Sequence, residues 1–266
     1  MLDLNNQTPL TLSQIATKAP AVVEQNASPR VSKHYVHIPT TVLISDMKKL
    51  GWEPVAVDQQ RSGGKESNKF AKHMVYFRNP EIVLKTEDGE VVFPQVLMVN
   101  SHDGKGAFQF HAGLFRLVCA NGLVVSTKDF GSLRIRHRGY SFEMLTETIK
   151  DLVGTLPRTV EVLNKFRDIQ LDEDQKVKFA LEAIGVRFGE NGAEVEPLEL
   201  LKPKREADKG NSLWAVYNIL QERIIQGGFE YKTESGRNKT AKKITAFSRD
   251  ISVNKELFAL AETYTS

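Results

Sequence analysis

The residues best suited to chemistry gather in one stretch, "VNSHDGKGAFQFHAGLFRLVCANGLVVS", at positions 99–126. It contains His102, Asp103 and His111, residue types that ligate transition metals or act as general bases, and Cys119, the single cysteine of the chain. The spacing argues against such a site, because His102 and His111 flank a predicted turn and the chain has no His-x-x-x-His pair. We therefore expect no metal, no cofactor and no catalytic residue here, and a buried, inert Cys119.

An enzyme remains the alternative, in the form of a metal-dependent nuclease or hydrolase that uses His102, Asp103 and His111. Ser101-His102-Asp103 has the composition of a catalytic triad, but adjacent residues rarely converge as a triad requires. The chain also lacks the glycine and lysine spacing of a P-loop and the Gly-x-Gly-x-x-Gly of a dinucleotide fold. The enzyme question stays open, with a non-enzyme favoured.

The composition predicts a soluble protein large enough for one or two packed domains. The chain has 266 residues, 41% of them apolar and 26% charged, and a net charge of +3. Its start resembles no signal peptide and no apolar run is long enough to span a membrane. We expect a cytoplasmic protein that makes no contact with membranes, and one cysteine excludes an intramolecular disulfide framework.

Positive charge is clustered, which favours nucleic acid as the partner. Basic segments occupy residues 61–73, 134–138, 202–209 and 237–243. In "RIRHR", a strand would place alternate guanidinium groups roughly 7 Å apart on one face, suited to gripping a phosphate backbone. The exposed aromatic residues expected to stack on bases are Tyr76, Phe77 and Tyr140. The residues predicted to bind DNA are Arg61, Lys65, Lys69, Lys72, Arg134, Arg136 and Arg138. The competing interpretation is ordinary solvated charge, or charge paired with acidic segments.

Hydrophobic periodicity predicts an α+β fold, with an antiparallel sheet of three or more strands flanked by helices and a mostly helical C-terminal part. Strands are expected over 34–38, 52–61 and 73–100, with a hairpin turn at Asp88-Gly89. Helices are expected over 40–50, over 141–188 with a break at Pro157, over 212–226 and near the C-terminus. The predicted organisation is an N-terminal arm that is mobile or docked on a neighbour (1–30), a sheet core (31–140) and a helical region (141–266) with a long loop at 189–211.

The stretch at 99–126 is then mainly architecture. Apolar residues from Ala107 recur at spacings of three and four, which predicts a core helix ending at Asn121-Gly122. Its candidate exposed contacts, secondary to the DNA-binding residues, are His102, Lys105, His111 and Arg116.

Several segments resemble a family of phage- and plasmid-borne proteins of unknown function. They are "RVSKHYVHIPTTVLISDMKKLGWEPV", "FAKHMVYF", "VNSHDG", "LFRLVCANGLV" and "YNILQERIIQGG", so the resemblance runs from about residue 30 to the C-terminus. It implies a mobile-element setting and carries no established activity.

The predicted order of a helix, three strands and a helix also resembles that of the single-strand annealing recombinases. The likeness implies an oligomer with single-stranded DNA in a groove lined by the predicted basic residues, although the family's sequence motifs are missing. The function predicted is therefore ATP-independent binding of single-stranded DNA and annealing of complementary strands, by a homo-oligomer. A factor that binds a host protein is the further alternative.

Overall fold

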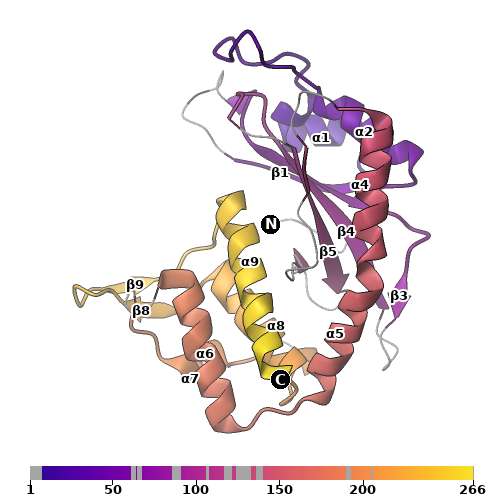
Figure 1. Cartoon of the computed structure of the whole chain (residues 1–266). Coiled ribbons are helices and arrows are strands. Elements are labelled where there is room, and N and C mark those ends of the chain that lie inside the picture. Colours follow the sequence, from indigo (N-terminus) through magenta and orange to yellow (C-terminus); the bar gives the residue numbers. More distant parts are fainter. Residues whose placement is uncertain are drawn as a thin grey trace. The chain divides into compact units, whose positions relative to one another are not determined.

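The computed structural model describes residues 8–60, 64, 68–85, 91–105, 108–116, 122–123, 133–135, 140–189, 193–204 and 206–265. Contacts between Cα atoms divide the chain into two compact units, residues 1–157 and 158–266. The predicted fold class is confirmed: an antiparallel sheet in the first unit is followed by a mostly helical second unit (Figure 1). Within the described ranges, no helix is both long and apolar enough to cross a membrane.

The sheet of the first unit has the strand order β1-β2-β4-β5-β6, with β3 paired to β4 and β7 to β5. Every pairing is antiparallel. The turn expected at Asp88-Gly89 lies outside the described residues, but β3 and β4 on either side of it pair as the prediction requires. The strands are β1 Glu53–Gln59, β2 His73–Arg78, β3 Leu84–Lys85, β4 Val91–Asn100, β5 Phe108–Arg116, β6 Gly122–Leu123 and β7 Leu133–Ile135.

The central strands are buried on both faces of the sheet. Val75, Met98 and Phe110 are successive partners across β2, β4 and β5, and each is fully buried. On the opposite face, Leu97 and His111 are cross-strand partners with exposures of 4% and 3%. Strands covered on both sides have apolar runs rather than a clean alternation of apolar and polar residues, as "HMVYF" in β2 illustrates.

The helix predicted over 107–121 was wrong, since residues 108–116 form β5, paired along its length with β4. The sequence "FQFHAGLFR" satisfies both periods: its apolar residues recur at three and four, but Phe108 and Phe110 also alternate with Gln109 and His111. Aromatic residues favour strands, and pairing with β4 satisfies the backbone groups of the segment. Cys119 and Asn121 lie outside the described residues, and Gly122, where the helix was expected to end, begins β6.

Residues 10–23, which belong to the predicted N-terminal arm, pack into the first unit. It forms α1 Leu12–Lys18, capped by Thr11, and the short helix η1 Pro20–Val23. Ile15, Ala21 and Val22 are fully buried, and the Leu10 amide donates to the Pro54 carbonyl of β1. The strand predicted over 34–38 is absent from the sheet. Residues 31–39 instead lead through turns and irregular backbone into α2 Thr40–Lys49, the helix predicted over 40–50, and Gly51 follows its end with φ +81°.

Tyr140 links the start of α4 (Phe142–Gly154) to α2. Its hydroxyl donates to Asp46 Oδ2 at 2.7 Å, and Asp46 is 6% exposed and also accepts from Lys49. Burial and this carboxylate raise the pKa of Tyr140. A hydrogen bond to a buried charge contributes more than one between neutral groups.

We expect Tyr140→Phe to lower the free energy of unfolding of the first unit by about 1.5 kcal/mol, because Asp46 loses a donor while still buried. Urea unfolding followed by Trp52 fluorescence, in a Trp214→Phe background, measures the change, since each unit contains one of the two tryptophans. Tyr264→Phe in the second unit is the matched control, followed by Trp214 in a Trp52→Phe background: the Tyr264 hydroxyl bonds Glu182, whose side chain is 37% exposed. A smaller loss in the first unit than in the control would contradict the expectation.

The second unit is built on helices and one small sheet. Pro157 lies in the first turn of α5, so the predicted break is confirmed: α4 ends at Gly154 and α5 begins at Leu156. The predicted long loop contains a single helical turn, α7, and a short η2. The elements are α5 Leu156–Asp168, α6 Glu173–Phe188, α7 Pro197–Leu200, η2 Glu206–Asp208, α8 Leu213–Gln226, β8 Glu230–Lys232, β9 Asn238–Thr240, α9 Phe247–Glu262 and η3 Thr263–Thr265.

Helix α8 is the centre of the second unit, and nearly all of its residues are buried. Tyr217 of α8 contacts the rings of Phe166 on α5 and Phe258 on α9, with centroid distances of 6.2 and 6.1 Å. Trp214 stacks on Tyr217 at 5.9 Å. Large aromatic side chains contribute much of a core's buried area, so these rings hold α5, α8 and α9 together.

Candidate nucleic-acid interface

Two histidines of the first unit, His73 and His102, belong to a buried polar network. Thr40, His73 and His102 are fully buried, and Asn100 is 1% exposed. The Ala71 carbonyl can only accept, so His73 Nδ1 donates to it at 2.9 Å, and Nε2 accepts from the Thr40 hydroxyl at 2.8 Å. Asn100 Nδ2 donates to the same hydroxyl at 2.9 Å, and His102 Nε2 lies 3.4 Å from it. The network ties the first turn of α2 to the ends of β2 and β4.

The Thr40 hydroxyl and the His73 ring could in principle act as nucleophile and base, but both are buried, so no substrate can reach them. Burial lowers the pKa of His73 to about 4, so the ring is neutral at pH 7. His102 and His111 are buried too, so they are not the exposed contacts that the sequence predicted. Asp103 accepts from the Ser101 hydroxyl and the Lys105 amide. Among the described residues, no three histidine, cysteine or acidic side chains are arranged to hold a metal.

Three of the seven predicted DNA-binding residues are described by the structure, and they lie on or beside the sheet. Lys69 is exposed and Lys72 half-buried, both just before β2. Arg134 lies on β7, and Met74, Val99, Gln109 and Arg134 are successive cross-sheet partners. Its backbone is therefore three strand spacings, about 14 Å, from β2. Lys105 is exposed and Arg116 ends β5. Arg61, Lys65, Arg136 and Arg138 lie outside the described residues.

The basic segment at 202–209 is paired with acidic side chains. Lys202 pairs with Glu199, Lys204 with Glu222 at 3.3 Å, and Lys209 with Glu206 at 2.7 Å. Here ordinary paired charge is the better interpretation, because neutralised lysines contribute little to a phosphate site.

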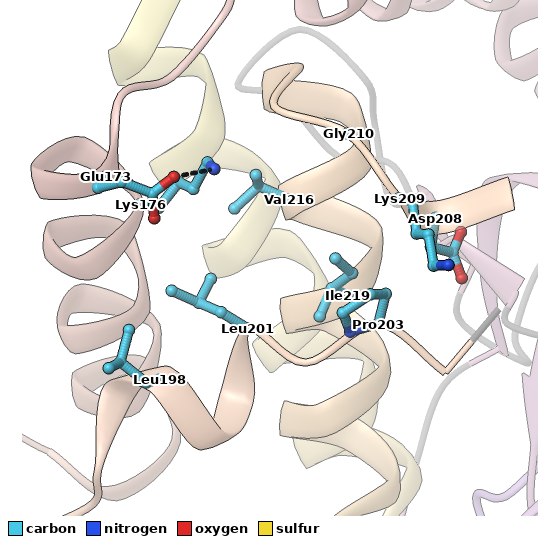
Figure 2. Close-up of a pocket in the computed structure, with 10 residues that line it drawn as sticks. All are labelled: Glu173, Lys176, Leu198, Leu201, Pro203, Asp208, Lys209, Gly210, Val216 and Ile219. Atoms are coloured by element: carbon cyan, nitrogen blue, oxygen red, sulfur yellow. Dashed lines mark hydrogen bonds and ion pairs between the residues drawn. The ribbon is translucent and has the colours of Figure 1, made fainter. Parts of the chain in front are cut away.

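A pocket of about 220 Å³ lies beside this paired segment (Figure 2). Leu198, Leu201 and Ile219 line it with apolar surface, and Lys176 at its rim already bonds Glu173 and Asn211. Its volume is below the roughly 300–1,000 Å³ of ordinary ligand pockets. The pocket is therefore a weak candidate for the functional site.

The strongest candidate is the basic hairpin, defined as residues 230–243. Strands β8 and β9 pair with Tyr231 opposite Lys239, and Figure 1 shows them projecting from the helices of the second unit. A tight turn joins them: the Thr233 amide donates to the Arg237 carbonyl at 2.9 Å, and Gly236 adopts φ +75°. A three-residue loop ending in a left-handed glycine is a standard hairpin connection. The sequence revealed the basic segment at 237–243 but not the two strands.

Buried and polar contacts anchor the base of the hairpin. The Gly228 amide donates to the Ala241 carbonyl and the Ala241 amide to the Phe229 carbonyl, each at 2.8 Å, and Ala241 and Phe229 are buried. Arg187 of α6 donates to the carbonyls of Ile224 and Lys242. Burial lowers the pKa of Arg187. These contacts hold the hairpin in one position on the helices.

The hairpin has one paired cation, Lys232, whose Nζ lies 3.9 Å from Glu194 Oε1. The cations of its second half, residues 237–243, differ from those at 202–209 in being unpaired. The segment "RNKTAKK" has four basic residues and no acid. All four, Arg237, Lys239, Lys242 and Lys243, are exposed, and within the described part of the chain none forms an ion pair. A lysine on an outer strand can simply discourage edge-to-edge aggregation. That explains Lys239 but not Lys242 and Lys243, which follow the strand. The arrangement can hold several phosphate groups.

The fold and the site together define an α+β protein with a buried histidine network and an exposed basic hairpin. The chain belongs to the family described as "Domain of unknown function (DUF932)", which matches residues 29–257. It is similar to two proteins of Escherichia coli (strain K12), "UPF0380 protein YfjQ" and "UPF0380 protein YafZ". Each is 28% identical, over 258 and 257 residues respectively, and each alignment covers 96% of this chain and 91% of the relative. No solved structure matches.

The resemblance to annealing recombinases finds no support in these matches. The structure also removes its premise, because the second helix of the expected element order is strand β5.

Proposed function

We propose that this protein binds nucleic acid through the phosphate backbone, with the basic hairpin as its principal contact and single-stranded DNA as its ligand. The observation that carries the proposal is the set of four exposed, unpaired cations between residues 237 and 243. Lysine and arginine that meet phosphates release condensed counterions, and this release supplies most of the affinity that is independent of sequence. No step of this binding requires a cofactor or ATP.

Two finer statements belong to the same proposal. A protein that grips only the backbone leaves most bases free to pair, so complementary strands held by several copies would anneal. The mobile-element setting rests on the segments that resemble phage- and plasmid-borne proteins. The structure does not support the alternative of DNA cleavage by His102 and His111, because both rings are buried.

We expect the wild-type protein to bind single strands with an affinity that falls steeply as salt rises. Replacing Arg237, Lys239, Lys242 and Lys243 together by alanine should weaken binding at least about tenfold. It should also flatten the plot of log affinity against log salt by up to about 3, since each lost phosphate contact on a single strand removes about 0.7 from the slope. Fluorescence anisotropy across a salt series measures both quantities.

The matched control removes four lysines that are already paired: Lys178, Lys202, Lys204 and Lys209. The change in net charge is identical, and we expect affinity within about twofold of the wild type. Equal losses in the two variants would mean that net charge matters and the hairpin does not. Absence of binding by the wild-type protein at about 50 mM salt, where the phosphate contribution is strong, would refute the proposed function.

A further inference from the structure

The aromatic residues predicted to stack on bases are not available for stacking. Tyr76 is 8% exposed and Phe77 is fully buried, both within β2. The Tyr140 hydroxyl is held by Asp46, and its ring packs edge-on against Phe108 at 6.0 Å. An aromatic contact to nucleic acid would therefore have to come from elsewhere.

Two half-exposed rings lie at the basic hairpin. Tyr231 of β8 and Phe188 at the end of α6 are both partly open to solvent, with centroids 4.8 Å apart and planes tilted by 36°. Phe188 is fixed from behind by the buried Phe229, edge-on at 6.2 Å, and by the Arg187 guanidinium 5.2 Å from its centroid. The pair forms a rigid aromatic surface that water reaches.

The pairing register places cations around Tyr231. Lys239 is its direct partner on β9, so the two side chains share one face of the hairpin. Arg237, two residues before Lys239, lies on the same face at the diagonal position, where side chains are about 7–8 Å apart. Half-exposed rings flanked by cations can bind a nucleotide, since the base stacks on the ring and the phosphate contacts the positive charge.

We propose that Tyr231, supported by Phe188, is a stacking platform for an unpaired base and makes the basic hairpin prefer single strands to duplexes. The inference rests on the proposed function, because the phosphate contacts must bring the strand to the hairpin. A base inside a duplex has both faces covered by its neighbours and cannot use the platform. The competing role of Tyr231 is structural, in which its contact with Phe188 only holds the hairpin against α6.

The test compares Tyr231→Leu and Tyr231→Phe with the wild type, using an oligothymidine and a duplex of the same length. We expect Tyr231→Leu to weaken binding of the single strand about tenfold, with duplex affinity and the salt slope unchanged. Tyr231→Phe keeps the ring and should bind both ligands like the wild type. A purely structural role predicts that Tyr231→Leu weakens both ligands equally or neither, and either result would overturn the platform.

A second measurement does not depend on the fold of Tyr231→Leu. Stacking quenches the fluorescence of 2-aminopurine, so oligonucleotides carrying this base should lose emission when the wild-type protein or Tyr231→Phe binds. Unchanged emission at saturation would overturn the platform while leaving backbone binding intact. A wild-type protein that binds neither ligand would refute the proposed function itself and the platform with it.

Discussion

Gly227→Ala is expected to destabilise the second unit by about 4 kcal/mol. Gly227 ends α8 with φ +72° and ψ −145°, a conformation that costs a residue with a side chain about 1–3 kcal/mol. An alanine Cβ would also lie 2.3 Å from the Ala241 carbonyl oxygen and 2.8 Å from its carbon, so the backbone itself would have to move. Overpacking of this kind costs a further 1–3 kcal/mol or so.

Gly228→Ala is the matched control. Gly228 also has a positive φ, +84°, but nothing lies within 4 Å of its added Cβ. It should cost only the backbone strain, about 1–2 kcal/mol, so the difference between the two variants isolates the overlap with Ala241. Urea unfolding followed by Trp214, in a Trp52→Phe background, reports on the second unit. Equal losses in the two variants would contradict the close contact.

Gly227→Ala also tests how the basic hairpin is anchored to the helices. Ala241 accepts from Gly228 and donates to Phe229 at the base of the basic hairpin, and Lys242 and Lys243 follow it directly. A shift of the Ala241 carbonyl therefore displaces two of the four unpaired cations. We expect Gly227→Ala to weaken DNA binding even under conditions where the variant is folded.

Helices α6 and α8 were predictable because each shows its own start, period and end in the sequence. Asp172 caps α6 together with Gln175, and Ser212 caps α8, which stops at a glycine. β5 was not predictable in this way. Its residues fit both periods, and the choice between them depended on pairing with β4, a separate segment of the chain. Local patterns fix helices better than strands, because only helices satisfy their hydrogen bonds within themselves.

Only part of the candidate site could be predicted from the sequence. The segments 202–209 and 237–243 have similar numbers of cations, but the first contains two acids, of which Glu206 pairs with Lys209, and the second contains none. That difference in acidic residues is evident from the sequence alone. Two features of the site are not: the ion pair that Glu222 of α8 forms with Lys204, and the pairing of Tyr231 with Lys239. The role of the histidines could not be predicted either, because the sequence does not reveal that His102 and His111 are buried.

The first unit should lose stability between neutral and mildly acidic pH because of His73. Burial lowers the pKa of this ring to about 4, against about 6.5 in an unfolded chain. Between these values the unfolded state binds the extra proton, so the stabilising contribution is complete above about pH 6.5 and is lost as pH falls towards 4. Linkage gives about 3 kcal/mol in total, with about 2 kcal/mol of it between pH 7 and pH 5.

The surroundings of His73 explain why it resists protonation. Nδ1 already donates to Ala71, and a proton on Nε2 would replace the hydrogen bond accepted from Thr40 by a second donor aimed at that hydroxyl. The titratable groups that face it are histidines: His102 lies 5.0 Å away ring to ring, and His37 lies 4.7 Å beyond His102. Burial also lowers the pKa of His37. No carboxylate among the described residues offers His73 a hydrogen bond or an ion pair.

His73→Gln should be less stable than the wild type at pH 7, because it disrupts the network, yet lose about 2 kcal/mol less on going from pH 7 to pH 5. Urea unfolding at several pH values, followed by Trp52 in the Trp214→Phe background, measures both effects. His34→Gln is the control, since His34 is exposed, and it should retain the wild-type pH profile. Parallel profiles for the wild type and His73→Gln would show that the buried ring does not control acid stability. A flattened profile would identify the Thr40–His73 contact as the acid-sensitive link between α2 and the sheet.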